Sequence, residues 1–350
     1  MPQDPIVPDL RSITSKDKFR KQIHVSAVNM ANDCGQRFVY RYLLGIKRPP
    51  NAFLLVGKST DESVTQDLDH KIDTGELLSR NDVLEISAAK FEEEQKNEPI
   101  ELALDEKEEG LSLEQVLGDA KDKAVALSGL HHDDAAPFIN AVKTRRKFSI
   151  DMDKFLRSRA KELHREADNR DDKFSKRLLD GQAAALNSAA RDGIDFVGEQ
   201  DIQEVIGDLL IIRDTKTSGK SPTPSIMDGS KKPGIADDSL QLTAYACASH
   251  VVDGKLPDKM VLDYLVRTNA ATPTVKYVPT VTVRDMDDVN VFLNRFTNLI
   301  HSMKSGVFMP ANENWWGCSK AWCGYWDICG YARHPKLVQI TTEIPKSEAS

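Results

Sequence analysis

The spacing of hydrophobic and polar residues along this chain of 350 residues predicts a mixed α/β protein. Apolar residues recur at helical spacing in 25–45, 53–72 and 286–306, so each segment is predicted to be a helix, the first of them serine-capped. Residues 153–191 carry no strand signal and are predicted to be helical or partly disordered. Residues 80–130 are strongly charged, and we expect them to form a solvated, acidic helical insertion.

Strand segments are predicted where apolar residues alternate with polar ones or form short aliphatic runs bounded by turn residues. Val142, Phe148 and Ile150 show the alternation, and the sequence "IGD" between two later strands is typical of a hairpin turn. The predicted strands cover 141–152, 194–205, 209–217, 260–268 and 275–283, with a helix over 239–252 between the third and the fourth.

Length and composition allow one large domain or two smaller ones. Hydrophobic residues make up 40% of the chain and charged residues 29%, with a net charge of −7, which is typical of a globular protein. Residues 1–24 are polar and contain several prolines, so we predict a flexible arm there. Residues 336–350 are predicted to be a flexible tail, which leaves a single domain over 25–335. The chain shows neither a membrane-length apolar stretch nor a signal-peptide layout, so we expect a cytoplasmic protein with no membrane contact.

The segment "DLLIIRDTKTSGKSP", residues 208–222, ends an aliphatic strand in two opposite charges. Side chains two residues apart in a strand share a face, so Asp214 and Lys216 point the same way. Leu209 to Ile212 are expected to bury the strand and hold that pair rigidly. Either the pair is an ordinary ion pair at the edge of a sheet, or it is half of an active site.

Three short motifs in order carry a family resemblance: "GEQD" ending at Asp201, "RDTKT" with Asp214 and Lys216, and "QLTAY" with Gln241 and Tyr245. Together they resemble the PD-(D/E)xK nuclease superfamily, and within it the RecB-like and Cas4-like exonucleases. The resemblance implies an α/β fold with a restriction-endonuclease-like core. Its central mixed β-sheet would be flanked by helices, with an N-terminal helical region and a C-terminal cysteine-rich segment.

The resemblance also implies the roles of the site residues. Asp201 and Asp214, with the carbonyl of Thr215, would bind Mg²⁺ or Mn²⁺, because these ions prefer oxygen ligands. Lys216 would orient the attacking water and stabilise the transition state. The resemblance further implies that Gln241 and Tyr245 shape the site and contact substrate.

Three other acidic residues bear on this site. Asp195 and Asp208 are alternatives to Asp201 as the second carboxylate. Asp61 stands where many relatives have the histidine of a G-x-x-x-H motif. It is either a further oxygen ligand, which changes the metal preference, or an acid on a helix surface.

The basic residues Lys143, Arg145 and Arg146 lie in the first predicted strand. They are placed either to meet phosphate groups of DNA or to remain solvated charges at the edge of the sheet.

Four of the five cysteines also match the family resemblance. Cys318, Cys323 and Cys329 crowd the C-terminus, and Cys34 precedes an aromatic-rich segment. In the family, such a set holds a [4Fe–4S] cluster that joins the two ends of the chain. Zinc bound by the same thiolates is the alternative, and Cys247 is expected to be a buried structural cysteine.

These features predict a metal-dependent DNA nuclease, and the resemblance favours an exonuclease of recombination, repair or phage DNA processing. DNA is the expected partner, and a recombination or repair protein is a further candidate partner. One alternative is a non-catalytic DNA-binding or assembly subunit that keeps the nuclease fold. Another is a zinc-organised scaffold with no nuclease role.

Overall fold

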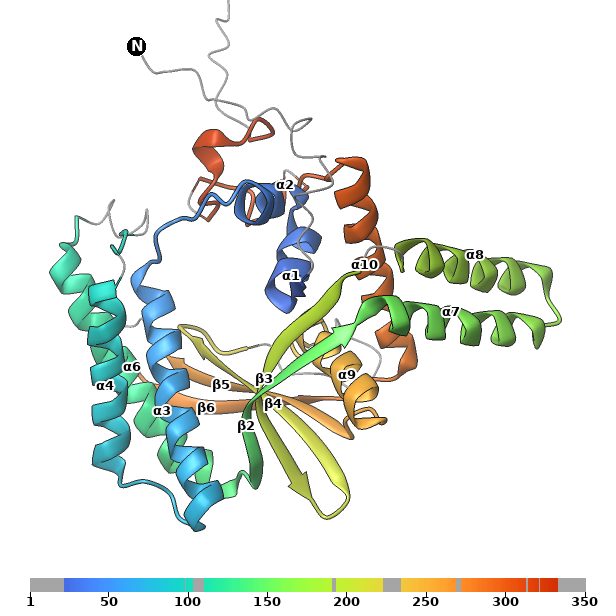
Figure 1. Ribbon diagram of the computed structural model, residues 1–350. Coiled ribbons are helices and arrows are strands. Elements are labelled where there is room, and N and C mark those ends of the chain that lie inside the picture. Colours follow the sequence, from blue (N-terminus) through green and yellow to red (C-terminus); the bar gives the residue numbers. More distant parts are fainter. Residues whose placement is uncertain are drawn as a thin grey trace, which may run out of the picture.

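A six-stranded mixed sheet with helices on both faces forms the centre of the computed structural model (Figure 1). The structure describes residues 22–97, 99–102, 110–190, 193–222, 234–268, 272–312, 314–320 and 322–332. The predicted fold class, a mixed sheet between layers of helices, is therefore confirmed. The predicted tail and most of the predicted arm lie outside the described residues.

The strands follow the predicted segments, with one addition. They are β1 (Gln22–His24), β2 (Ala141–Asp151), β3 (Asp195–Ile206), β4 (Leu209–Ser218), β5 (Lys259–Arg267) and β6 (Val275–Thr282). Hydrogen bonding joins them in the order β1-β3-β4-β5-β6, and β2 pairs with β3. The addition, β1, falls in the predicted arm, so that prediction was wrong for Gln22–His24. These residues pair in parallel with β3. Leu209 was also expected to be buried, yet its side chain is 42% exposed beside the turn.

Strand β3 pairs with three other strands, and this arrangement leaves part of one edge of β3 unpaired. Antiparallel β2 follows β3 from 195 to 204, so β1 and β4 must divide the other edge between them. Strand β4 pairs with residues 202–206 of β3, and β1 pairs with residues 195–197. Residues 198–201 of β3 therefore face a gap between β1 and β4.

One face of the sheet is covered by α3 (Ala52–Thr74), α4 (Arg80–Asn97) and α6 (Leu113–Asp134) (Figure 1). The helices predicted over 80–130 are confirmed in the described residues, but the expectation that this region is solvated was wrong, because α4 and α6 each have a buried apolar side. Phe91 of α4 and Leu127 of α6 are fully buried in a cluster with α3. The charged residues of both helices lie on their outer sides and hide this pattern in the sequence. Residues 103–109, which are part of the predicted insertion, lie outside the described residues.

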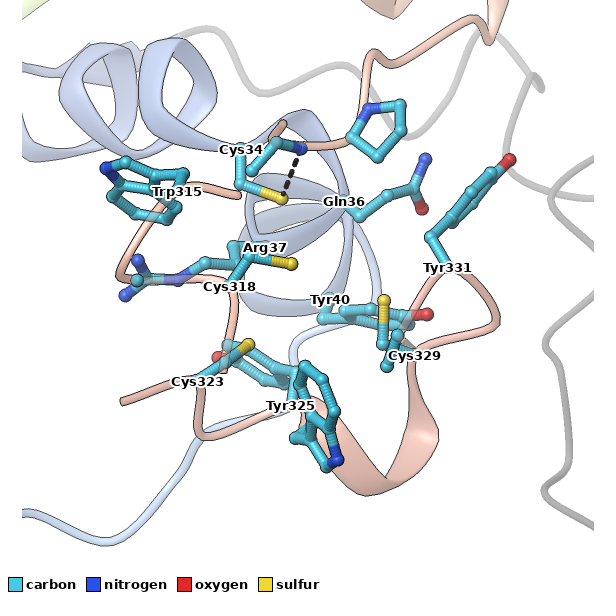
Figure 2. Close-up of a pocket in the computed structure, with 15 residues that line it drawn as sticks. Cys34, Gln36, Arg37, Tyr40, Trp315, Cys318, Cys323, Tyr325, Cys329 and Tyr331 are labelled. Atoms are coloured by element: carbon cyan, nitrogen blue, oxygen red, sulfur yellow. Dashed lines mark hydrogen bonds between the residues drawn. The ribbon is translucent and has the colours of Figure 1, made fainter. Parts of the chain in front are cut away.

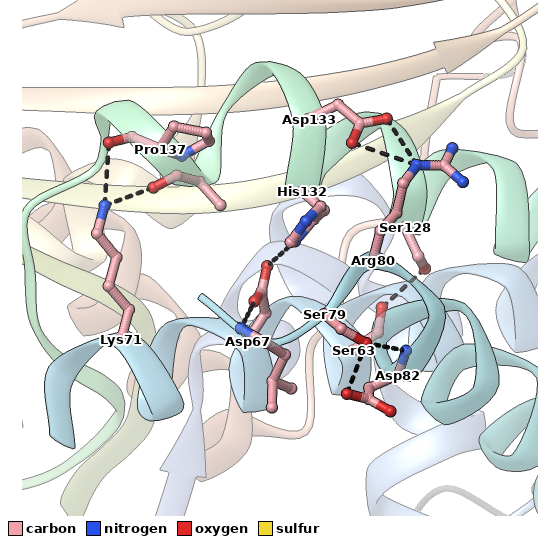
Figure 3. A network of polar contacts seen from close by, with 12 residues as sticks. Ser63, Asp67, Lys71, Ser79, Arg80, Asp82, Ser128, His132, Asp133 and Pro137 are labelled. Carbon is pink, nitrogen blue, oxygen red and sulfur yellow. Dashed lines mark hydrogen bonds and ion pairs between the residues drawn. The ribbon is translucent and has the colours of Figure 1, made fainter. Parts of the chain in front are cut away.

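A polar network ties α3 to α6 within this layer (Figure 3). The Ser63 hydroxyl donates to the Ser128 hydroxyl at 2.7 Å, and His132 Nδ1 lies 2.9 Å from the Asp67 carboxylate. Lys71 Nζ donates to backbone carbonyls at the C-terminal side of α6, including that of Pro137 at 3.0 Å. Because buried polar groups are costly unless paired, these contacts fix the two helices in one relative position.

The other face packs against α1 (Val25–Asp33), α9 (Leu240–Asp253) and α10 (Met286–Ser305). Phe196 of β3 lies between Phe292 and Phe296 of α10, with ring centroids 5.2 and 5.8 Å away. The predicted helices over 239–252 and 286–306 are confirmed as α9 and α10.

The predicted single helix over 25–45 is wrong, because the backbone is extended at Cys34. The segment divides into α1, α2 (Gly35–Phe38) and a π-helical turn, η3 (Val39–Leu43). No serine caps it, since the residue before α1 is His24, which makes no side-chain capping bond.

A helical hairpin, α7 (Met152–Asp168) and α8 (Lys173–Ala189), is inserted where β2 turns into β3. Asp151 and Asp195 remain strand partners on either side of it, so the insertion leaves the register intact. The two helices extend outward from the body of the protein (Figure 1). Residues 153–191 were predicted to be helical or partly disordered, and their described part is almost entirely helical. No helix in the described ranges is both long enough and apolar enough to cross a membrane.

A buried charge cluster crosses the sheet on the side of α6. The Arg213 guanidinium donates to Glu204 at 2.6 Å and to Asp263 at 3.1 Å, and the Tyr277 hydroxyl donates to Asp263 at 2.6 Å. Glu204 and Asp263 are both fully buried. Burial raises the pKa of Asp263, although Arg213 and the Tyr277 hydroxyl act against this rise. The cluster joins β3, β4, β5 and β6 through side chains as well as through their backbones.

His131 of α6 lies fully buried near this cluster, and within the described chain neither ring nitrogen forms a hydrogen bond. Burial, followed by the positive charge of Arg213, lowers the pKa of His131 to about 3. The folded protein therefore keeps this imidazole neutral where the unfolded chain, with an ordinary histidine pKa near 6.5, takes up a proton.

We therefore expect His131 to cost stability as the pH falls from about 6.5 toward 3, and to have no such effect above that window. Replacement by leucine, His131→Leu, removes the proton uptake. The free energy of unfolding of the variant then depends less on pH, by up to about 1.4 kcal/mol per pH unit in this window. Urea unfolding at several pH values measures this, with the exposed His164→Leu as the control. Equal slopes for His131→Leu and the wild type would contradict the expectation.

Candidate active site

Asp201 and Asp214 meet where β3 and β4 separate. The last paired residues on this side of the ladder are Ile202 and Arg213, so the two aspartates occupy the next positions along each strand. The Thr215 amide donates to Asp201 Oδ2 at 3.2 Å. A side chain therefore satisfies a backbone donor at the point where β3 leaves β4.

Strand β3 changes face at Asp201. The Gln200 side chain donates to the Tyr245 carbonyl of α9 at 3.1 Å, whereas Ile202 packs in a cluster with Leu68 of α3. Residues two apart in a regular strand share a face, and these two contact opposite layers. Asp201 stands at the change, which places its carboxylate in the opening of the sheet.

The opposite strand is irregular at the same level. Arg145 of β2 has φ of 42°, in the left-handed region that side chains rarely adopt. It lies between Thr144, which pairs with Ile202, and Arg146, which pairs with Gln200, so it stands opposite Asp201 without pairing with it. Thr144 and Arg145 both bond to α3, through Asp69 and through Asp61 respectively. Strands β2 and β3 thus both change face at this level.

Side chains of β4 and α9 form one connected network around Asp214. Asp214 is fully buried and forms an ion pair with Lys216. Gln241 joins them, since its Nε2 donates to Asp214 Oδ1 at 2.8 Å and its Oε1 accepts from Lys216 Nζ at 3.0 Å. The Gln241 amide also lies 2.8 Å from the Tyr245 hydroxyl. The structure therefore brings together Asp201, Asp214, Lys216, Gln241 and Tyr245.

The charges of this network act strongly on one another. Burial and then the neighbouring Asp214 raise the pKa of Asp201 well above its ordinary value. Burial disfavours the charge of Lys216, but Asp214 and Asp201 outweigh it and raise the pKa of that ammonium group. Lys216 therefore stays protonated. Its single positive charge does not neutralise both carboxylates.

Asp61 approaches this site from α3 but is engaged elsewhere. Its carboxylate accepts from Arg145 Nη2 at 2.8 Å, and the same nitrogen donates to Glu62 at 2.9 Å. The charge of Asp61 also contributes to the raised pKa of Asp201, so the two lie within electrostatic range. Across the described ranges, no three His, Cys, Asp or Glu side chains are close enough to hold one metal ion.

The two alternatives to Asp201 lie away from the network. Asp195 begins β3 and is the strand partner of Asp151 and Gln22. Asp208 lies in the turn between β3 and β4, at the far end of the ladder from Asp214. Of the three candidates, Asp201 is the one that lies beside Asp214, and burial together with the charge of Asp214 raises the pKa of Asp201.

Of the basic residues predicted near phosphate, two form ion pairs. Arg145 binds Asp61, and Arg146 binds Asp253 with a donor distance of 2.7 Å. Lys143 is exposed on β2.

Two clefts flank Gln241, and Asn29 of α1 lines both of them. Glu199 lines the first, and Lys216 and Arg295 line the second. The Asn29 Oδ1 atom is buried and accepts no hydrogen bond within the described chain. Asn29 and Arg295 carry no motif in the sequence, because their place at the site depends on how α1 and α10 dock.

A second cavity brings four cysteines together (Figure 2). Cys34, Cys318, Cys323 and Cys329 all line it, and none of them forms a disulfide. The Ala311 amide donates to Cys34 Sγ at 3.3 Å. Cys247, as predicted, is instead buried in the core, where burial raises the pKa of its thiol to about 12.

Hydrogen bonds join the N-terminal and C-terminal segments of the described chain around this cavity. The Gly35 amide donates to the Met309 carbonyl at 2.8 Å, and the Tyr40 hydroxyl donates to the Ile328 carbonyl at 3.2 Å. A Cβ atom at Gly35 would lie 2.6 Å from the Met309 oxygen, so this contact requires glycine. The approach of the C-terminal segment at Gly35 explains why the predicted helix breaks at Cys34.

Comparison with known proteins gives a family for the chain. No curated protein matches the chain. A solved structure named "Putative exonuclease" from Eubacterium rectale is similar, with 10% sequence identity and a TM-score of 0.42 over 91% of this chain and 92% of that one. The sequence model described as "PD-(D/E)XK nuclease superfamily" matches residues 22–330. Because this match covers most of the chain, the protein belongs to the PD-(D/E)XK nuclease superfamily.

Proposed function

We propose that the protein is a divalent-metal-dependent deoxyribonuclease, with Asp201, Asp214 and Lys216 as its catalytic residues. The observation that carries the proposal is the meeting of two carboxylates and a lysine at the point where β3 and β4 separate. The resemblance to RecB-like and Cas4-like enzymes favours exonuclease action, in recombination, repair or phage DNA processing.

The charges at the site support a bound cation. Asp201 and Asp214 lie together in a largely buried position, and Asp61 adds to the negative potential there. Lys216 is the cation that neutralises the pair, since Arg145 is bound to Asp61 and Glu62. Burial and then the negative charge of Asp214 raise the pKa of Asp201, and a divalent cation would offset that negative charge.

The residues present fit Mg²⁺ or Mn²⁺, because they offer hard oxygen donors. Asp201, Asp214 and the Thr215 carbonyl would hold the ion, with Asp61 joining them if it leaves Arg145. When bound, the cation supplies a polarised water and stabilises charge on the phosphoryl oxygens. Lys216, kept protonated by its carboxylate neighbours, orients the attacking water and donates to a phosphoryl oxygen.

Gln241 acts as a positioning residue. It contacts both Asp214 and Lys216, so it fixes the separation of the carboxylate from the ammonium group. The buried Tyr245 hydroxyl supports Gln241 from the next turn of α9.

Removal of either central charge is expected to abolish cleavage. Asp214→Asn and Lys216→Ala should each lower the rate of Mg²⁺-dependent digestion of end-labelled linear DNA by about 10²-fold or more. Asp208→Asn is the matched control, since it removes a carboxylate from the far end of the same hairpin. Chelation by EDTA should stop the wild-type reaction.

The same assay separates catalysis from binding alone. A wild type that binds DNA but degrades none with Mg²⁺ or Mn²⁺ would indicate a non-catalytic DNA-binding subunit. Wild-type rates in both Asp214→Asn and Lys216→Ala would exclude these residues from the chemistry.

We further propose that Cys34, Cys318, Cys323 and Cys329 bind a [4Fe–4S] cluster. All four line one cavity, and thiolates are the ligands of such clusters. The Ala311 amide that donates to Cys34 Sγ is the kind of contact that stabilises a thiolate ligand.

The choice of a cluster over zinc rests on the family resemblance of the four-cysteine motif. Zinc bound by the same four thiolates, at about 2.3 Å each, is the alternative. In the described chain no three of these side chains are grouped closely enough to hold a metal ion.

Metal analysis of protein purified without oxygen tests this proposal. We expect about four irons per chain, little zinc, and visible absorbance that bleaches on reduction. Cys329→Ser should lose this absorbance and lower the melting temperature, whereas Cys247→Ser should retain the iron. Stoichiometric zinc without iron would show a zinc-organised segment instead.

A further inference from the structure

A pocket outside the active site lies between the start of α3, the middle of α6 and the end of β5. Phe53 and Val56 of α3 line it, together with Asp119 and Lys123 of α6 and with Arg267 and Thr268 at the end of β5. It is separate from the two clefts that flank Gln241, and neither the resemblance nor the family match assigns it a role.

Two cations stand close together in this pocket. The pKa of Lys123 is lowered, first by burial and then by the positive charge of Arg267. Arg267 is half-buried and forms no ion pair or hydrogen bond through its side chain with the described residues. Asp119 is exposed at the rim. Arg267, whose charge is unpaired among the described residues, and Lys123 beside it give this part of the pocket a positive potential that favours an anion.

An aromatic ring stands beside these charges. Phe53 is 50% exposed, although the same helix buries Leu55 and Val56. Lys123 Nζ lies 5.6 Å from the centroid of the Phe53 ring. A cationic group next to an open aromatic face is the combination that binds a phosphate and stacks the adjoining base.

The pocket lies close to the active site along two elements. Phe53 precedes Asp61 by eight residues on α3, about 12 Å along the helix axis. Arg267 follows Tyr264, the strand partner of Lys216, by three residues, about 10 Å along β5. Between them, a Cβ atom at Gly57 would lie 3.9 Å from the Thr217 hydroxyl, next to Lys216. A few nucleotides of one strand can span this distance.

We propose that this pocket binds single-stranded DNA a few nucleotides from the phosphate that is cut, with a phosphate held by Arg267 and Lys123 and a base stacked on Phe53. The proposal rests on the nuclease function proposed above. Stacking on Phe53 requires a base that is free of its duplex, so the pocket selects for a single strand.

Binding without cleavage is the direct test. Fluorescence anisotropy with a short labelled oligothymidylate, in EDTA and over a range of salt concentrations, measures affinity and its salt dependence. Phe53→Ala should weaken binding about 5-fold or more, and Phe53→Trp should restore it. Arg267→Gln should weaken binding and lower the salt slope by about 0.7, the value for one phosphate contact on a single strand.

The control is Lys161→Gln, which removes one exposed positive charge from α7. It should leave affinity unchanged, and Arg267→Lys should retain most of the salt slope even if Arg267→Gln folds poorly. Wild-type binding by both Phe53→Ala and Arg267→Gln would overturn the proposal. Equal competition by inorganic phosphate and by the oligonucleotide would also overturn it, because the pocket would then recognise an anion and not a strand.

Failure of this proposal differs from failure of the proposed function. If the wild type cleaves DNA and the pocket variants bind DNA like the wild type, the proposed pocket is contradicted and the proposed nuclease function is supported. If the wild type cleaves nothing and the pocket variants lose strand binding, the nuclease function is contradicted and the pocket is supported.

Discussion

The arrangement of the site depends on one interaction, the pairing of the Arg213 guanidinium with Glu204 and Asp263. Breaking a buried ion pair by removing one partner typically costs about 3–5 kcal/mol, because it leaves a charge without compensation. The cluster thus fixes β4 against β3 and β5 on the face covered by α6. Neighbouring residues of a strand point to opposite faces, so the same constraint fixes Asp214 on the face covered by α9.

Separation of β3 from β4 then creates the space in which the carboxylates meet. A fully paired sheet would place Asp201 and Asp214 as ordinary cross-strand neighbours with like charges, which is unfavourable. Here the ladder ends one residue earlier, and the Thr215 amide turns to Asp201. The unusual backbone of Arg145 on β2 accommodates the change of face from the other side. Geometry that would weaken a structural sheet therefore provides the opening that a metal and a phosphate would need.

Much of the core was predictable from local patterns, and so was the grouping of the candidate residues. Strand alternation and the turn sequence between β3 and β4 are local signals, and the motifs lie on those same elements, so their meeting follows from the hairpin and from α9. The helices α4 and α6 were misjudged because abundant surface charge concealed a narrow apolar side that includes Phe91 and Leu127.

Features that depend on distant contacts could not be read from the sequence. The break at Cys34 results from a segment that arrives from the other end of the domain. The strand β1 is three residues long and gains its form only from β3. Asp61 bonds to Arg145, 84 residues away, and no local pattern shows such a partner.

The contacts between the N-terminal and C-terminal segments affect the stage of synthesis at which the site can be completed. Gln36 donates to the Phe308 carbonyl, 272 residues later in the chain, so α2 gains its partner only when synthesis of the domain is nearly complete. The preceding helix, α1, carries Asn29 into both clefts at the site. A ribosome releases the chain from its N-terminus onward, so a nascent chain holds Asp201 and Lys216 well before α1 is secured. The topology thus delays completion of the candidate active site until almost the whole domain has been synthesised.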